Sequence, residues 1–173
     1  RAQLAANDRA IERVRELVEK HGWPTVEAAF DAVIDYSRKR IENELEEIPD
    51  GVYRANDRLE GDGVTEEEIP IEVTVTVDDT TVDVDFSGTS SQVAGNMNAP
   101  LAVAKSAVYF FVRAVTHPDI PPTAVCYQPI SVRVPEGSLL NPTHPAAVVG
   151  GNVETSQRVT DVVLDAFAEA VPE

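Results

Sequence analysis

Between residues 69 and 86 the apolar residues recur at every second position, and this alternation constrains the fold more than any other feature. Ile or Val occupies positions 69, 71, 73, 75 and 77, and Val or Phe occupies positions 82, 84 and 86. A period of two sends alternate side chains to opposite faces of a β-strand. One face is therefore buried and the other meets water, which is typical of antiparallel sheets. The polar residues at 78–80 predict a hairpin turn between the two strands.

The first part of the chain has helical spacing instead. Apolar stripes with a period of 3.6 run through residues 4–18 and 26–48. His21-Gly22 is a typical end of a helix, and Pro24 is typical of a helix beginning. Two amphipathic helices joined by so short a turn predict an antiparallel helical hairpin.

More helices and strands are expected after the alternating segment. Residues 101–115 are apolar on nearly every side, which predicts a helix buried within the domain. Short strands are expected at 52–59 and 130–134. A final helix begins near Glu154 and has one apolar face. That face consists of Val159, Val162, Val163, Ala166, Phe167 and Ala170.

These elements place the chain in the α+β class. We expect a helical hairpin at residues 1–50 and a mainly antiparallel β-sheet with two packed helices at residues 51–173. A length of 173 residues is enough to bury a sizeable core. Because the sequence opens at Arg1 inside a helical pattern, we expect the whole chain to be an excised fragment of a longer subunit.

The acidic composition limits the partners. The chain has 30 Asp and Glu against 14 Lys and Arg, for a formal charge of -16. Such a surface repels nucleic acid and anionic membranes, so we expect neither as a partner. Acid-rich, lysine-poor surfaces also occur in proteins from salt-loaded cytoplasm, so a halophilic source is left open. The lone cysteine, Cys126, fits a reducing compartment, and we expect a cytoplasmic protein.

The sequence predicts no metal site. The acidic segment 56–68 lacks the pattern of a calcium-binding loop, because Leu59 occupies a position that requires an oxygen ligand. We therefore expect a solvated acidic loop. His21, His117 and His144 are interpreted as structural, since no nucleophile or metal-ligand motif surrounds them.

The polar segment 85–100 has two interpretations. Asn96 and Asn98 bracket a methionine just before the helix expected at residue 101. Asparagine caps helices and tolerates turns, so both residues suit a loop that only connects a strand to a helix. A carboxamide also offers a donor and an acceptor side by side, which match the N–H and C=O of a cyclic amide.

The stretch GGNVETSQR, residues 150–158, is equally ambiguous. Glu154 and Thr155 are favourable at the N-terminus of a helix, so we expect them to cap the final helix. Gly150-Gly151 allows a close approach or a sharp turn of the backbone. The chain lacks a phosphate-loop motif, so we do not expect it to bind ATP.

Two blocks of the sequence resemble one protein family. They are DFSGTSSQVAGNMNAPLA, residues 85–102, and PEGSLLNPTHPAAVVGGNVETSQR, residues 135–158. Both are similar to the hydantoinase B/oxoprolinase family, and the resemblance extends over essentially the whole chain. That family supplies one subunit or half of ATP-dependent N-methylhydantoinases and 5-oxoprolinases, and of the related acetone carboxylases. Because its members are much longer, the resemblance implies a central segment.

The resemblance also implies partners and cofactors. ATP and Mg would be bound by a hydantoinase A-like partner subunit, in a hetero-oligomer, and this fragment would bind no cofactor. A divalent metal site expected of some members would lie before Arg1. The implied activity is hydrolysis of a cyclic amide, a hydantoin or 5-oxoproline, after activation by ATP. Two alternatives stay open: a segment of an ATP-dependent ketone carboxylase, and a non-catalytic scaffold and subunit-interface module.

The cyclic-amide hypothesis assigns roles to the two blocks. Phosphorylation of an amide oxygen makes the carbon open to attack by water, and the protein must hold the ring and stabilise developing charge. We expect Glu154 as a base and Arg158 as a charged donor. The expected substrate-binding residues are Asn96, Asn98, Gly151, Asn152 and Gln157.

Overall fold

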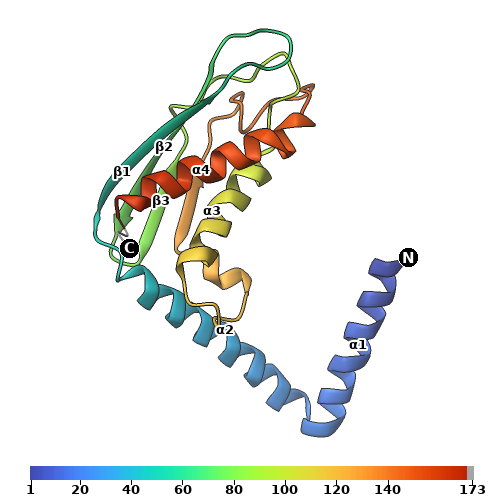
Figure 1. Cartoon of the computed structure of the whole chain (residues 1–173). Helices are drawn as coiled ribbons and strands as arrows, with labels where there is room; N and C mark the ends of the chain where they lie inside the picture. The colour runs from blue at the N-terminus through green and yellow to red at the C-terminus, as the bar shows by residue number, and fades with distance from the viewer. Residues whose placement is uncertain (171–173) are drawn as a thin grey trace.

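The computed structural model describes residues 1–170 and confirms the α+β class. These residues form four α-helices and four strands, with two short 3-10 helices, η1 and η2, before β4 and α4 (Figure 1). The elements are α1 (Ala2–His21), α2 (Trp23–Leu45), β1 (Gly51–Leu59), β2 (Ile69–Asp78), β3 (Thr81–Asp85), α3 (Leu101–Val115), η1 (Ala124–Tyr127), β4 (Ile130–Arg133), η2 (Gly150–Asn152) and α4 (Glu154–Ala168).

The strands form one sheet in the order β1-β2-β3-β4. β1 pairs with β2, and β2 with β3, in antiparallel register, so the predicted alternation does form a hairpin. Asp79 takes the turn with a φ of 54°. β4 joins β3 in parallel, because the chain crosses over through α3 between these two strands. The sheet is thus mainly antiparallel, as the sequence predicts.

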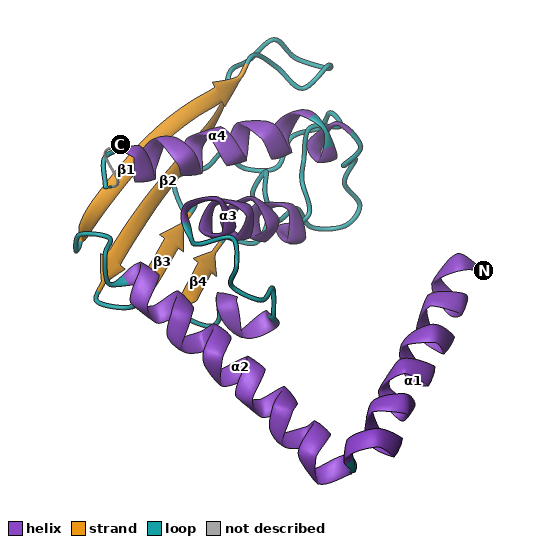
Figure 2. Cartoon of the chain, turned by 60° about the horizontal axis from the view of Figure 1, so that its bottom comes forward, coloured by secondary structure: helices purple, strands orange, loops and turns teal. Residues whose placement is uncertain are grey.

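Two helices cover one face of the sheet (Figure 2). The inward residues of β2, from Ile69 to Val77, are all buried, whereas Glu72 on the other face is exposed. α4 packs on β1 and β2 and also contacts α3. The rings of Phe111 and Phe167 stack between α3 and α4 with centroids 3.8 Å apart. All six apolar positions predicted for the final helix are buried, so that prediction is confirmed.

The predicted N-terminal helical pair is present, but its helices open into a V (Figure 1). Gly22, with a φ of 79°, ends α1 and precedes α2. α1 has no buried residue, whereas α2 buries Val26, Ser37, Ile41 and Leu45. The apolar stripe of α1 is therefore exposed on this chain, and the C-terminal half of α2 joins the pair to the sheet domain.

Within residues 1–170, no helix combines the length and the apolar character needed to cross a membrane.

Two isoleucines test this difference between α1 and α2. Ile41 is fully buried and Ile11 is 49% exposed. We expect Ile41→Ala to lower the free energy of unfolding by ~2–5 kcal/mol, because it leaves a cavity in the core. Ile11→Ala removes the same atoms from water-exposed surface and should stay within ~0.5 kcal/mol of the parent protein. Urea unfolding measures both; equal losses would contradict the exposed position of α1.

Candidate functional site

Two loop segments that are distant in the sequence are docked against each other beside the N-termini of α3 and α4. The N–H of Gly151 donates to the carbonyl oxygen of Asn96 at 3.1 Å. The hydroxyl of Thr155 donates to the carbonyl oxygen of Met97 at 2.6 Å. The two blocks that carry the family resemblance therefore form one structural unit.

Gly151 allows the two backbones to approach this closely. A Cβ atom at Gly151 would lie 1.9 Å from the carbonyl oxygen of Asn98, which is far inside van der Waals contact. A Cβ at Gly150 would lie 2.9 Å from Oδ1 of Asn96. The close approach of the backbone expected for Gly150-Gly151 is confirmed, and its partner is the 96–99 segment.

Asn98 is fully buried and holds this unit together. Its Oδ1 accepts from the N–H of Val93 at 2.8 Å. Its Nδ2 donates to the carbonyl oxygens of Val93, Gly95 and Ala147 at 2.9, 3.1 and 3.1 Å. Since both ends of the carboxamide bind backbone, Asn98 is a positioning residue for the loops and presents no free donor to a ligand.

The prediction that Thr155 caps α4 is wrong. α4 begins after Val153, and no side chain makes a capping hydrogen bond there. Thr155 is fully buried, and its hydroxyl donates to the carbonyl oxygen of Met97 instead. Glu154 lies exposed in the first turn, where its charge still favours the helix dipole.

Most of the acidic segment is exposed, as expected of a solvated loop, but residues 56–59 form the end of β1 and one carboxylate is an exception. Asp62 is buried, and its Oδ1 accepts from the N–H groups of Val64 and Thr65, both at 2.8 Å. Its Oδ2 accepts from the N–H of Gly95 at 2.7 Å. Hydrogen bonds from Thr65, Gly95 and Val64 lower the pKa of Asp62 from 3.8 to about 2. This carboxylate therefore fastens the acidic loop to the same loop that Asn98 organises.

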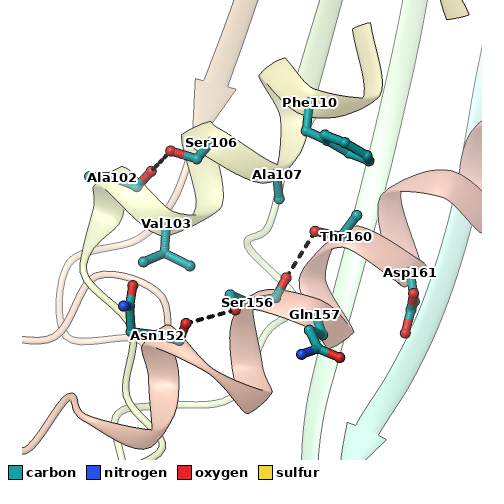
Figure 3. A pocket seen from close by; sticks show the side chains of 10 residues that line it. All are labelled: Ala102, Val103, Ser106, Ala107, Phe110, Asn152, Ser156, Gln157, Thr160 and Asp161. Atoms are coloured by element: carbon teal, nitrogen blue, oxygen red, sulfur yellow. Dashed lines mark hydrogen bonds between the residues drawn. The ribbon is translucent and has the colours of Figure 1, made fainter. Parts of the chain in front are cut away.

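An open groove of about 540 Å³ lies between α3 and α4, next to the docked loops (Figure 3). α3 contributes small and apolar side chains, and the first turns of α4, with the segment before it, contribute mainly polar ones. The lining residues are Ala102, Val103, Ser106, Ala107, Phe110, Asn152, Ser156, Gln157, Thr160 and Asp161.

Only part of the polar lining is free to bind a ligand. The hydroxyls of Ser106, Ser156 and Thr160 donate to carbonyl oxygens four residues earlier in the chain, at 2.7, 3.1 and 2.9 Å. The carboxamides of Asn152 and Gln157 lie on exposed residues at the groove. These two carboxamides are exposed at the groove and available to a ligand.

The structure brings some of the predicted site residues together and separates others. Asn152 and Gln157 line the groove, whereas Asn96 lies beside Gly150 and is not among the lining residues. Glu154 and Arg158 do not line it. The guanidinium of Arg158 is paired with Asp57 of β1 at 2.8 Å.

The ion pair with Arg158 also affects the pKa of the Asp57 carboxyl group. Hydrogen bonds from the backbone N–H of Arg58 and from Arg158 lower the pKa of Asp57. The charge of Arg158 is thus already matched by a partner on the sheet.

The contribution of α3 to the groove is not evident from its sequence. Phe110 is 58% exposed at the groove, although the apolar character of its helix predicts burial on nearly every side. The small residues Ala102, Ser106 and Ala107 lie on the same face and leave room for the groove. Their spacing of four and five residues places them on one face of α3, and this pattern could have indicated a groove there.

Among residues 1–170, no three His, Cys, Asp or Glu side chains cluster in a way that could hold a metal ion.

Comparison with known proteins now identifies the family. The model of the hydantoinase B/oxoprolinase family matches residues 1–173. The chain belongs to this family. The recognition made from the two blocks is therefore confirmed, and the docked loops and groove are features of a hydantoinase B/oxoprolinase chain.

Two relatives and one solved structure illustrate the similarity. 5-oxoprolinase 1 of Arabidopsis thaliana is 42% identical over 96% of the chain. The B-type subunit of a putative D-/L-hydantoinase of Pseudomonas sp. is 32% identical over 99% of it. The crystal structure of an ATP-dependent caprolactamase from Pseudomonas jessenii covers 99% of the chain, with a TM-score of 0.86 and 24% identity, and so shares its fold.

The chain spans only part of each of these proteins. It covers 14% of the plant relative, 31% of the hydantoinase subunit and 30% of the caprolactamase chain.

Two threonines on α4 test the docking of the loops. Thr155→Val removes the donor to Met97 and leaves a partly buried carbonyl oxygen without this hydrogen bond, so we expect a loss of ~1–3 kcal/mol in the free energy of unfolding. Thr160→Val is the matched control, because the hydroxyl of Thr160 contacts only its own helix and should matter little. Denaturant titration compares the two; a similar small loss for both would argue against the docking contact.

Asp62 gives the chain a predictable response to acid. Its lowered pKa means that its stabilising effect is complete above about pH 4 and is lost as the pH falls through 2. Asp62→Asn should lower the melting temperature at neutral pH and flatten its decline between pH 4 and 2. Asp8→Asn, at an exposed residue of α1, should leave the decline unchanged. Thermal melts across this pH range decide; parallel curves for Asp62→Asn and the parent would refute the prediction.

Proposed function

We propose that this chain is a segment of the B-type subunit of an ATP-dependent cyclic-amide hydrolase, and that the groove between α3 and α4 binds the ring amide. Family membership and the names of the relatives, a 5-oxoprolinase and a putative hydantoinase, support this activity class. An A-type partner subunit would supply ATP and Mg. The observation that carries the proposal is the groove with its two available carboxamides, Asn152 and Gln157.

The chemistry follows from the stability of the amide bond. Transfer of a phosphoryl group from ATP to the amide oxygen weakens the resonance that protects the carbonyl carbon. Water then adds to that carbon and the C–N bond breaks, with a proton going to the departing ring nitrogen. A second water molecule releases the phosphate, leaving a carboxylate and either an amine, from a lactam, or a urea group, from a hydantoin. The steps up to the breaking of the C–N bond require the ring to be held in one orientation.

Asn152 and Gln157 suit the holding role. A carboxamide pairs its N–H with the ring oxygen and its C=O with the ring N–H. Both side chains come from the start of α4 and the turn before it, whose position is set by the contacts of Gly151 and Thr155 with the 96–99 segment. The roles of Glu154 as a base and Arg158 as a charged donor remain proposals, and they require movement or a group from another subunit, since neither lines the groove.

Substitution of the two carboxamides tests the proposal. In the full-length subunit assembled with its A-type partner, Asn152→Ala and Gln157→Ala should each reduce ATP hydrolysis stimulated by a cyclic amide by about tenfold to a thousandfold. The melting temperature should not change, because both residues are exposed. Asn43→Ala, at an exposed asparagine of α2, is the control and should keep full activity. Full activity in all three variants would favour the scaffold alternative.

A further inference from the structure

We propose that the groove between α3 and α4 selects an uncharged cyclic amide with an apolar substituent, a hydantoin or lactam, over a ring that carries a carboxylate. This inference rests on the proposed function, and it names the class of ring that the groove accepts. Three kinds of side chain that line the groove determine this preference.

The α3 side provides an apolar surface. The small side chains of Ala102, Val103 and Ala107 line the groove on the α3 side (Figure 3). Phe110 is 58% exposed and lines the same side. The ring remains exposed to water at the groove after folding. Contact with an apolar group would remove this surface from water and so lower the free energy of the complex. The substituent of the cyclic amide is therefore expected to contact Phe110.

The α4 side provides neutral hydrogen-bonding groups. The hydroxyls on this side are engaged by the backbone of the same segment, so Asn152 and Gln157 carry the amide recognition. Their carboxamides match a ring amide without any charge on the ligand. A ligand that offers only N–H and C=O groups satisfies them fully.

The charges around the groove disfavour an anion. None of its ten lining residues is Lys, Arg or His, and one of them is Asp161. The nearby cation Arg158 is paired with Asp57 at 2.8 Å and does not line the groove. A ligand carboxylate would therefore lie near Asp161 with no cation among the lining residues to pair with it.

The N-terminus of α4 favours an anionic ligand, in contrast to the acidic lining of the groove. A helix N-terminus carries a partial positive charge that attracts anions. Glu154 places a full negative charge in that first turn and offsets the attraction. The formal charge of -16 adds a long-range repulsion of anions. The balance favours a neutral ring.

A matched pair of ligands tests the inference directly on the 173-residue protein. 5-oxoproline and 5-oxoprolinamide have the same ring and differ only in a carboxylate or a carboxamide. In titration calorimetry at pH 7 we expect 5-oxoprolinamide to bind at least about tenfold more tightly. Asp161→Asn should narrow this ratio severalfold, and Asp165→Asn, at an exposed aspartate outside the groove, should not.

The apolar contact has its own comparison. Phe110→Ala should weaken binding of 5-benzylhydantoin about tenfold and leave unsubstituted hydantoin unchanged. Because Phe110 and Asp161 are exposed, circular dichroism should show intact folding in the variants. Equal affinity for 5-oxoproline and its amide, or no binding of any of these rings, overturns the inference.

The full assembly separates failure of this inference from failure of the proposed function. If 5-oxoproline drives ATP hydrolysis as well as neutral rings do, and Asn152→Ala abolishes it, the function stands and the selectivity is wrong. If no cyclic amide stimulates ATP hydrolysis, the proposed function itself is wrong.

Discussion

The buried carboxamide of Asn98 is the interaction on which the rest of this site depends. It binds the backbone at Val93, Gly95 and Ala147, so it connects the loop before α3 to the loop before α4. A buried amide is tolerated because its donors and acceptor are satisfied, and any loss of a partner would leave a costly unpaired group. The absence of a side chain at Gly151 then lets the second backbone reach Asn98. The start of α4, and with it the groove, follows from these contacts.

Asp62 connects the loops held by Asn98 to the end of strand β1. Its carboxylate joins the loop after β1 to Gly95, whose carbonyl oxygen in turn accepts from Asn98. A Cβ on Gly95 would lie 1.9 Å from the carbonyl oxygen of Asp62, so this junction also requires a glycine. Three loops are thus held by two polar side chains and two glycines. Such an arrangement restricts the motion of the loops by satisfied hydrogen bonds.

The sequence predicted the secondary structure well because periodicity reports which face of an element is buried. The alternation in β2 and the stripe of α4 both follow this rule, and both are confirmed. The site was less predictable because its contacts join residues far apart in the chain. Thr155 is a residue type found at helix N-termini and lies in the first turn of α4, yet its hydroxyl donates to the carbonyl oxygen of Met97. Phe110 belongs to an apolar helix, and only the packing of α4 beside α3 determines that it faces a groove. Tertiary contacts determine the partner of Thr155 and the environment of Phe110, and local sequence propensity carries no information about such contacts.

The placement of charge gives the groove its chemical character. Asp161 is the only ionisable residue among the ten that line it, while Arg158 is held on the sheet side of α4 by Asp57. A reaction that transfers phosphate needs positive charge to stabilise the developing anion. The lining of this groove supplies none, so it suits recognition of a neutral ring better than phosphoryl transfer. Under the proposed function, ring binding would belong to this chain, and the positive charge needed for the chemistry of ATP would have to come from outside the groove.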